Sequence, residues 1–484
     1  MARFSPLMAS LPLLVSLMGA TFHAQANNQL PDIGTAGVAA LPIEQEVRYG
    51  NAFMRFARAG LPIIDDPVLN EYIDDLGQRL LTNADGVRFP FTFFLINDPS
   101  INAAAFLGGR VKVHTGLFLY ADNESELASV LAHEITHVTQ RHIARYMEAQ
   151  ASSSAMTLAG LVGSIALAVI NPTAGIAALQ TTLGLSMQSA INYTRDNEYE
   201  ADRIGMKTLY DAGFDPMGMA NFFQKLAAEY RYASKPPEML LTHPLPETRI
   251  SEARARAGSY GRRALPPSLD FWLAKVRIQV RYGTESPQAL LTYFDSRLQK
   301  GDYPLKDAAT YGKALALLQL KRTDEADTLM QGLAARHPED LFVVDALTDI
   351  DLAKGRSAQA IARLERFRTR MPDNEVVVVN LGNAYLEGGN YQKSIAILDP
   401  YAREHDENSL AWSLLSDAYR KAGRMTDLHM ARAETLSLRG DYQAAIDELI
   451  VARGTTSDKL TLARIEARIT QLERAKKDLD SLKG

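Results

Sequence analysis

Apolar residues recur with two spacings in the first part of the chain, and each spacing predicts a different element. Residues 66–81 carry apolar side chains three or four positions apart, at Val68, Tyr72, Ile73, Leu76 and Leu80, which predicts an amphipathic helix. Residues 91–96 are aromatic and β-branched, and residues 110–115 alternate between apolar and polar side chains, so both segments are predicted strands. The second strand is expected to have one exposed face. An exposed edge strand can hold an extended peptide by backbone hydrogen bonds, and a hairpin that touches no substrate is the alternative.

The next apolar pattern predicts a helix that begins after Asn123. Asn123 can cap this helix, and Glu126 follows three residues later, as in a capping box. Apolar residues then repeat at helical spacing, at Leu127, Val130, Leu131, Ile135 and Val138. One side of the helix is therefore expected to be buried.

Residues 263–484 have a repeating helical pattern with a period of 34 residues. Gly355, Gly389 and Gly423 are 34 residues apart, and so are Pro338 and Pro372. This period, with a glycine between helices and a terminal proline, is the tetratricopeptide pattern, in which each unit is a pair of helices. Residues 341–374 and 375–408 are the clear repeats, with weaker units before them and further helices to about residue 482. The last units fall out of step, as an irregular terminal cap would.

Stacked helix pairs form a curved solenoid with a concave surface, which predicts an all-α second domain that binds a partner or substrate. The alternative is a passive solenoid that only stabilises the first domain.

Residues 149–194 contain no Asp, Glu, Lys, Arg or His over 46 positions. Two apolar arms, residues 158–170 and 174–185, are each short for a bilayer span. Three interpretations stay open: buried helices over the functional site, a mobile lid or loop that makes peripheral membrane contact through residues 151–190, and a membrane hairpin.

The N-terminus and the composition indicate export. Residues 1–26 look like a secretory signal, with Arg3, an apolar run over residues 7–20 and Ala24-Gln25-Ala26 as the cleavage site; an uncleaved anchor is the alternative. The chain has no cysteine, so neither disulfides nor cysteine metal ligands are available. A formal charge of −5 gives no general basic face, so we expect no nucleic-acid partner. These features predict a periplasmic protein cleaved after about Ala26.

The predicted helix after Asn123 contains a His-Glu-x-x-His sequence at residues 133–137. Residues four apart lie on one helix face, so His133 and His137 can bind one ion with Glu134 beside them. Neutral imidazoles suit zinc, and the expected chemistry is amide hydrolysis with Glu134 taking a proton from the attacking water. The alternative is two histidines on a solvated helix face.

A third ligand is expected from residues 195–206. On a helix Glu198 and Asp202 share a small, apolar face, whereas Glu200 lies in a charged stripe with Arg203. Glu198 is therefore the expected ligand, Glu200 is expected to form a solvated ion pair with Arg203, and Asp202 can hold a ligand imidazole in one tautomer.

These motifs, together with the segment 102–115 and the later His243-Pro244-x-x-x-x-Arg249, resemble the M48 family of zinc metallopeptidases. The resemblance implies one Zn²⁺ per chain held by His133, His137 and Glu198, with Glu134 as the base. It places Asp202 in a supporting or proton-donating position. It also implies a mainly α peptidase domain with a small β-sheet, of the α+β zincin type, over residues 27–262, followed by the repeat domain at 263–484.

His243 lies in a proline-rich loop, and three roles stay open for it: stabilising the oxyanion, occupying the open coordination site and silencing the enzyme, or making no metal contact. Arg249 is expected to hold this loop by pairing with a carboxylate or a backbone carbonyl. His114 and His142 are expected to be plain surface or packing residues.

An exported M48 peptidase with tetratricopeptide repeats resembles periplasmic members of the family that act in the quality control of outer-membrane β-barrel proteins. The resemblance implies that unfolded or misassembled barrels are substrates, and that the repeats contact the β-barrel assembly machinery. The alternative function is a repeat-based chaperone or adaptor with a latent or dormant metal site.

Overall fold

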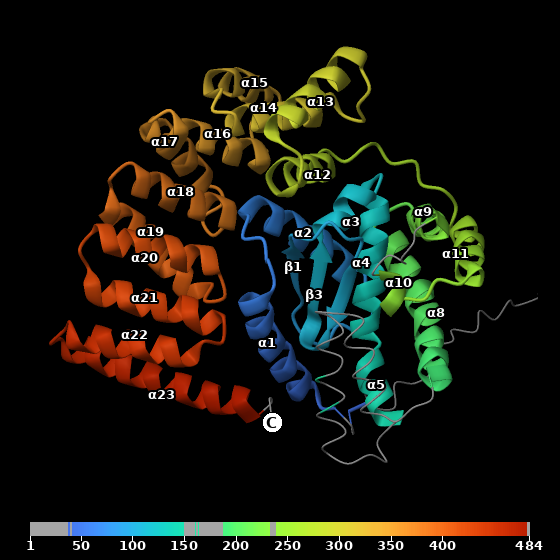
Figure 1. The fold of residues 1–484 in the computed structure, drawn as a ribbon, viewed down its shortest axis with the longest axis horizontal. Helices are drawn as coiled ribbons and strands as arrows, with labels where there is room; N and C mark the ends of the chain where they lie inside the picture. The colour runs from blue at the N-terminus through green and yellow to red at the C-terminus, as the bar shows by residue number, and fades with distance from the viewer. Residues whose placement is uncertain are drawn as a thin grey trace, which may run out of the picture. The chain divides into compact units, whose positions relative to one another are not determined.

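The computed structural model describes residues 37–38, 41–149, 160, 163, 187–232 and 239–481, which are mostly helical (Figure 1). The predicted signal sequence and most of the uncharged stretch lie outside the described residues, as does most of the segment for which membrane contact is predicted. Within the described ranges, no helix has both the length and the apolar character needed to cross a bilayer.

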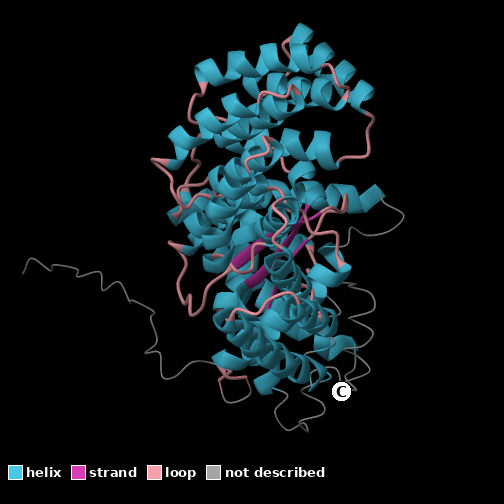
Figure 2. Ribbon diagram, turned by 90° about the vertical axis from the view of Figure 1, so that its left-hand side faces the viewer, coloured by secondary structure: helices cyan, strands magenta, loops and turns pink. Residues whose placement is uncertain are grey.

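A three-stranded sheet lies among these helices (Figure 2). Its strands are β1 (Thr92–Ile96), β2 (Ala103–Phe106) and β3 (Arg110–His114), in the order β1-β3-β2. β3 runs parallel to β1 and antiparallel to β2. The two predicted strands are confirmed, but the predicted edge position of residues 110–115 is wrong because β3 is paired on both sides. β2, which lies in a run of alanines with weak strand character, is the edge strand next to the helix that carries the histidines.

The exposed face predicted for this strand is also wrong. Lys112 and His114 are 2% and 4% exposed, so both faces of β3 are covered over these residues. The ring of His114 is satisfied inside the fold, because its Nδ1 lies 2.9 Å from the Ser100 hydroxyl. A central strand covered by helices is buried on both faces whatever its sequence pattern.

The helices around the sheet begin where the sequence predicts. Asp66 accepts a hydrogen bond from Leu69 N at the start of α2 (Pro67–Leu81). Asn123 accepts one from Glu126 N, 3.1 Å away, at the start of α4 (Glu124–Thr139). The other helices of this half are α1 (Ile43–Gly60), α3 (Thr115–Tyr120), α5 (His142–Ala149), α8 (Met187–Asp211), α9 (Met217–Tyr232), α10 (Met239–Thr242) and α11 (Glu247–Tyr260).

The remaining helices form successive pairs. They are α12 (Leu269–Tyr282), α13 (Pro287–Lys300), α14 (Lys306–Gln319), α15 (Thr323–Arg336), α16 (Leu341–Ala353), α17 (Ser357–Arg368), α18 (Glu375–Glu387), α19 (Tyr391–Glu404), α20 (Ser409–Lys421), α21 (Met425–Leu438), α22 (Tyr442–Gly454) and α23 (Lys459–Ser481). The clear predicted repeats match the pairs α16–α17 and α18–α19. Gly355, Gly389 and Gly423 have φ between 68° and 75°, so these turns use the left-handed conformation that glycine adopts without strain.

Candidate metal centre

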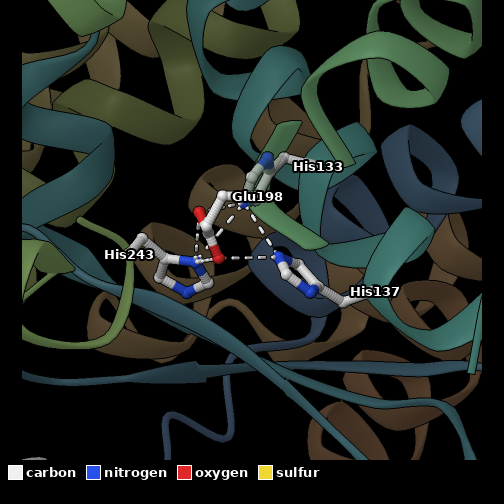
Figure 3. A group of neighbouring side chains, drawn as sticks. All are labelled: His133, His137, Glu198 and His243. Atoms are coloured by element: carbon white, nitrogen blue, oxygen red, sulfur yellow. Dashed lines mark hydrogen bonds and ion pairs between the residues drawn. The ribbon is translucent and has the colours of Figure 1, made fainter. Parts of the chain in front are cut away.

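The two histidines of the predicted motif point to one place from successive turns of α4 (Figure 3). Their Nε2 atoms lie 3.0 Å apart, and the ring of His133 is almost completely buried. Burial lowers the pKa of His137 to about 3, which keeps its imidazole neutral. The solvated-face alternative is therefore wrong for this pair.

Glu198 reaches the same place from α8, which packs against α4. Its carboxylate oxygens lie 3.3 Å from Nε2 of His133 and 3.3 Å from Nε2 of His137. Burial alone would raise the pKa of Glu198, but the charges of His243 and Arg249 hold it well below its usual range. Glu198 is thus ionised, and it faces inward as predicted.

His243 completes the cluster from the loop that follows α10 (Figure 3). Its Nδ1 lies 3.0 Å from a Glu198 oxygen and 3.3 Å from Nε2 of His133. The ligand atoms of His133, His137, Glu198 and His243 all lie within 4.8 Å of one another. Ligands at tetrahedral zinc distances are about 3.3 Å apart. The residues present therefore fit a metal ion.

Glu134 lies between this cluster and the sheet. Its Oε2 accepts a hydrogen bond from Ala105 N of β2, at 2.9 Å. Its Oε1 is buried without a hydrogen-bond partner and lies 3.4 Å from Nε2 of His243. Burial raises the pKa of Glu134. A buried carboxylate oxygen facing the cluster is suited to accept a proton there.

Asp202 and Arg249 support the cluster from behind. Asp202 Oδ1 lies 3.0 Å from Nδ1 of His133, on the far side of the ring from the ligand atoms. Arg249 donates two hydrogen bonds to Asp202, at 2.7 and 2.8 Å, and contacts Glu198 Oε2 at 2.7 Å. It also donates to the carbonyl oxygen of Pro244, so it holds the His243 loop as predicted.

The structure corrects two expectations about neighbouring residues. Glu200 does not pair with Arg203, because Arg203 pairs with Glu252 on α11. Glu200 instead contacts His142 and Arg145 of α5. His142 is 4% exposed, and its Nδ1 lies 2.8 Å from Nδ1 of His137.

Sequence periodicity gave no signal for this contact. If α4 continued as one helix, residue 142 would lie about 140° around the axis from His137, since each residue turns the helix by about 100°. The contact exists because the chain turns at Arg141, whose φ is 53°. A side chain with this φ is uncommon outside glycine and asparagine, and the sequence does not mark it.

Comparisons with known proteins match both halves of the chain. The model of peptidase family M48 matches residues 67–257, and a tetratricopeptide repeat model matches residues 351–418. The β-barrel assembly-enhancing protease of Yersinia pestis is 50% identical over 340 residues, 70% of each chain. The protein of the same name from Escherichia coli (strain K12) is 46% identical over 345 residues, 71% of each chain. A protein of Vibrio cholerae is 54% identical over 322 residues, so that match spans 66% of its length.

Proposed function

The chain belongs to peptidase family M48, together with the β-barrel assembly-enhancing proteases of Yersinia pestis and Escherichia coli, and we propose that it is a zinc endopeptidase of outer-membrane barrel quality control. Its substrates are unfolded or misassembled outer-membrane β-barrel proteins in the periplasm. The chain reaches that compartment through the signal at residues 1–26, cleaved after about Ala26. The observation that carries the proposal is the convergence of His133, His137 and Glu198 beside the buried carboxylate of Glu134.

Two imidazoles and one carboxylate are a donor set that suits zinc, and they leave one position for water or substrate. His133, His137 and Glu198 would hold the ion. A bound zinc ion would polarise the scissile carbonyl and lower the pKa of a water molecule next to it.

Glu134 takes the proton of the attacking water. Its free Oε1 faces the ligand cluster, and burial shifts its pKa upward, toward the range in which a carboxylate both accepts and returns a proton near neutral pH. The hydrogen bond from Ala105 N to the other oxygen orients the carboxylate. Because this bond comes from the edge strand β2, the same strand is placed to align an extended peptide along the cluster.

His243 lies where it would take the remaining position beside a bound metal ion. One ring nitrogen lies among the ligand atoms and the other lies 3.4 Å from Glu134, where the water of the reaction has to stand. This geometry favours the silencing role over oxyanion stabilisation. We therefore propose a latent enzyme whose His243 loop moves away when substrate arrives.

The tetratricopeptide repeats supply the binding surface for barrel substrates and for the β-barrel assembly machinery. Support comes from the concave surfaces that such solenoids form and from the names of the relatives. A chaperone or adaptor function remains the second candidate, because the position of His243 would give a protein that binds zinc without hydrolysis.

The test measures zinc content and cleavage of an unfolded outer-membrane β-barrel protein by the mature chain. Glu134→Gln should keep zinc and lose cleavage by a factor of about 10²–10⁴, the usual contribution of a general base. His243→Ala should cleave faster than wild type, and His337→Ala, altered in a loop of the repeat half, should not change.

Three outcomes separate the candidates. Zinc-loaded wild type that stays inactive while His243→Ala cleaves establishes the latent enzyme. An active wild type that loses cleavage on His243→Ala favours oxyanion stabilisation. Cleavage by none of the variants, with full complementation of a deletion strain by Glu134→Gln, favours the adaptor.

A further inference from the structure

The turn between α4 and α5 is fixed by a buried ion pair. Arg141 adopts φ of 53° directly after the helix that carries His133 and His137. Its guanidinium donates to Glu46 Oε1 of α1 at 3.0 and 2.8 Å and to the carbonyl oxygen of Leu41 at 2.5 Å. Both charged side chains are 3% exposed. These contacts hold the uncommon backbone conformation and set the direction in which α5 leaves.

The turn brings His142 back against His137. The two Nδ1 atoms lie 2.8 Å apart, and the ring planes are close to perpendicular. On its other side, Nε2 of His142 lies 3.3 Å from Oε2 of Glu200. The same Glu200 oxygen accepts a hydrogen bond from Arg145, at 2.8 Å. A line of hydrogen bonds therefore runs from Glu200 through His142 to the back of His137.

Only one arrangement of protons satisfies this line when His137 presents a free Nε2. A carboxylate accepts and cannot donate, so the proton of His142 lies on Nε2, toward Glu200. Nδ1 of His142 is then an acceptor, and the proton of His137 lies on Nδ1 and is donated to it. Nε2 of His137 keeps its lone pair, directed at the ligand cluster.

We propose that Glu200 and His142 form a relay that sets the tautomer and ring orientation of His137. The proposal rests on the proposed function, in which His137 binds zinc. His142 and Glu200 are positioning residues and do not touch the metal or the substrate. The tautomer of His133 is set without an intermediate residue, because Asp202 lies directly at its Nδ1.

His137 needs His142 between its ring and a carboxylate, whereas His133 contacts Asp202 directly, and the reason is geometric. His137 is one turn closer to the end of α4 than His133, and its Nδ1 faces His142 of α5, whereas Nδ1 of His133 faces Asp202 of α8. Glu200 lies on α8 two residues after Glu198 and contacts α5, too far around the helix to reach His137 itself. His142 bridges this gap.

The test is a pair of substitutions of His142 in the full mature chain, one that keeps the side-chain volume and one that keeps the hydrogen-bond acceptor. Leu at position 142 keeps the packing volume but has no acceptor, whereas Asn loses volume but places a carboxamide oxygen near the position of Nδ1. Zinc dissociation constants are measured by competition with a chromophoric chelator. The relay predicts 10–100-fold weaker binding for His142→Leu, as for other partners of ligand histidines, and binding within a few-fold of wild type for His142→Asn. The reverse order would establish a packing role and overturn the relay.

Glu200→Ala tests the outer end of the relay, with Glu252→Ala as the control, because Glu252 is also a partly exposed carboxylate but is paired with Arg203. Glu200→Ala should weaken zinc binding several-fold and Glu252→Ala should not. Equal effects would exclude a specific role for Glu200.

A second measurement separates failure of the relay from failure of the proposed function. Nitrogen-15 NMR of ring-labelled histidine in the metal-free chain, assigned with His137→Ala, reports which nitrogen of His137 carries the proton. Nδ1 protonation in wild type that is lost in His142→Leu supports the relay even if zinc does not bind. A mixture of tautomers in wild type would overturn it.

Discussion

The metal centre can be compared with a second buried polar cluster, formed around Arg277, because the two differ in the kind of atoms that face one another. At the junction of the two halves, Arg277 of α12 is 1% exposed and contacts Asp66 at 2.7 Å, Asp345 at 2.6 Å and the Tyr311 hydroxyl at 3.0 Å. Each of these contacts joins a donor to an oxygen. In the metal centre, by contrast, Nε2 of His133 and Nε2 of His137 face each other at 3.0 Å.

The difference shows which cluster needs a further cation. In the Arg277 cluster the arginine itself supplies a permanent positive charge beside the carboxylates of Asp66 and Asp345, so this cluster needs no further cation. In the metal centre burial opposes the charged form of His133, yet the charges of Glu198 and Asp202 raise its pKa to about 10. The cluster therefore draws a positive charge to the place where its ligand atoms meet. A metal ion bound there would supply such a charge and displace a proton from His133.

The largest effect on the free energy of unfolding is expected when the Arg277 cluster loses its arginine. Arg277→Met leaves Asp66 and Asp345 buried without their cation, and loss of one partner of a buried pair costs about 3–5 kcal/mol. Urea unfolding should show this loss. Arg281→Met is the control, because Arg281 is partly exposed and pairs with Asp349 at the edge of the cluster, and it should cost about 1 kcal/mol or less. Equal costs would mean that Arg277 is not the centre of the junction.

Zinc should stabilise the folded chain through the metal centre and leave the contacts of the Arg277 cluster unchanged. At a free concentration 100-fold above its dissociation constant, a ligand specific for the folded state adds about 2.7 kcal/mol. Thermal unfolding with zinc and with chelator measures this shift. It should persist in Arg277→Met and disappear when His133 and His137 are both changed to Ala. A shift that survives the double change would place zinc elsewhere.

Removing one support from the metal centre should have a smaller effect. Asp202→Asn puts an amide where the carboxylate contacts Nδ1 of His133 and accepts from Arg249, which should weaken zinc binding by about 10–100-fold. Asp211→Asn, an exposed change on the same helix, is the control. Chelator competition measures both constants, and an unchanged constant for Asp202→Asn would assign that residue to structure alone.

The smallest effect is expected at the acidic part of the junction, where a cavity of about 560 Å³ is lined by residues that include Glu71 of α2 and Glu375 of α18. Burial, aided by the charges of Glu71 and Asp65, raises the pKa of Glu375 to about 7. The folded chain therefore holds this proton more tightly than the unfolded chain, whose glutamates titrate near 4.5. The stabilisation is complete below pH 4.5 and is lost as the pH rises through 7.

Glu375→Gln should remove this dependence and raise the free energy of unfolding at pH 8 by about 1 kcal/mol, a value reduced for the partial exposure of the side chain. At pH 4.5 it should have no effect. Glu387→Gln, at the exposed end of α18, is the control. A gain that is independent of pH would mean that titration of Glu375 is not its source.

Sequence patterns were sufficient to predict the elements that depend on residues close together in the chain. The caps at Asp66 and Asn123, the apolar face of α2 and the glycine turns of the repeats formed as predicted, because each depends on residues within one or two helical turns. Periodicity also predicted that Glu198 faces inward, since helical spacing separates Glu198 from the charged stripe of the same helix. The spacing of His133 and His137, four residues apart, likewise predicted that both lie on one face of the helix.

Tertiary structure decided what depends on residues far apart in the chain. Strand pairing made β3 central and β2 the edge strand, because pairing partners are chosen by the whole sheet. The partners of Glu200 and His142 depend on the turn at Arg141, which is held by Glu46, 95 residues earlier. The loop of His243 reaches the metal centre because Arg249 binds Asp202 on another helix. The sequence by itself thus determined which residues bear the chemistry, whereas their protonation, supports and access follow from contacts that only the folded chain makes.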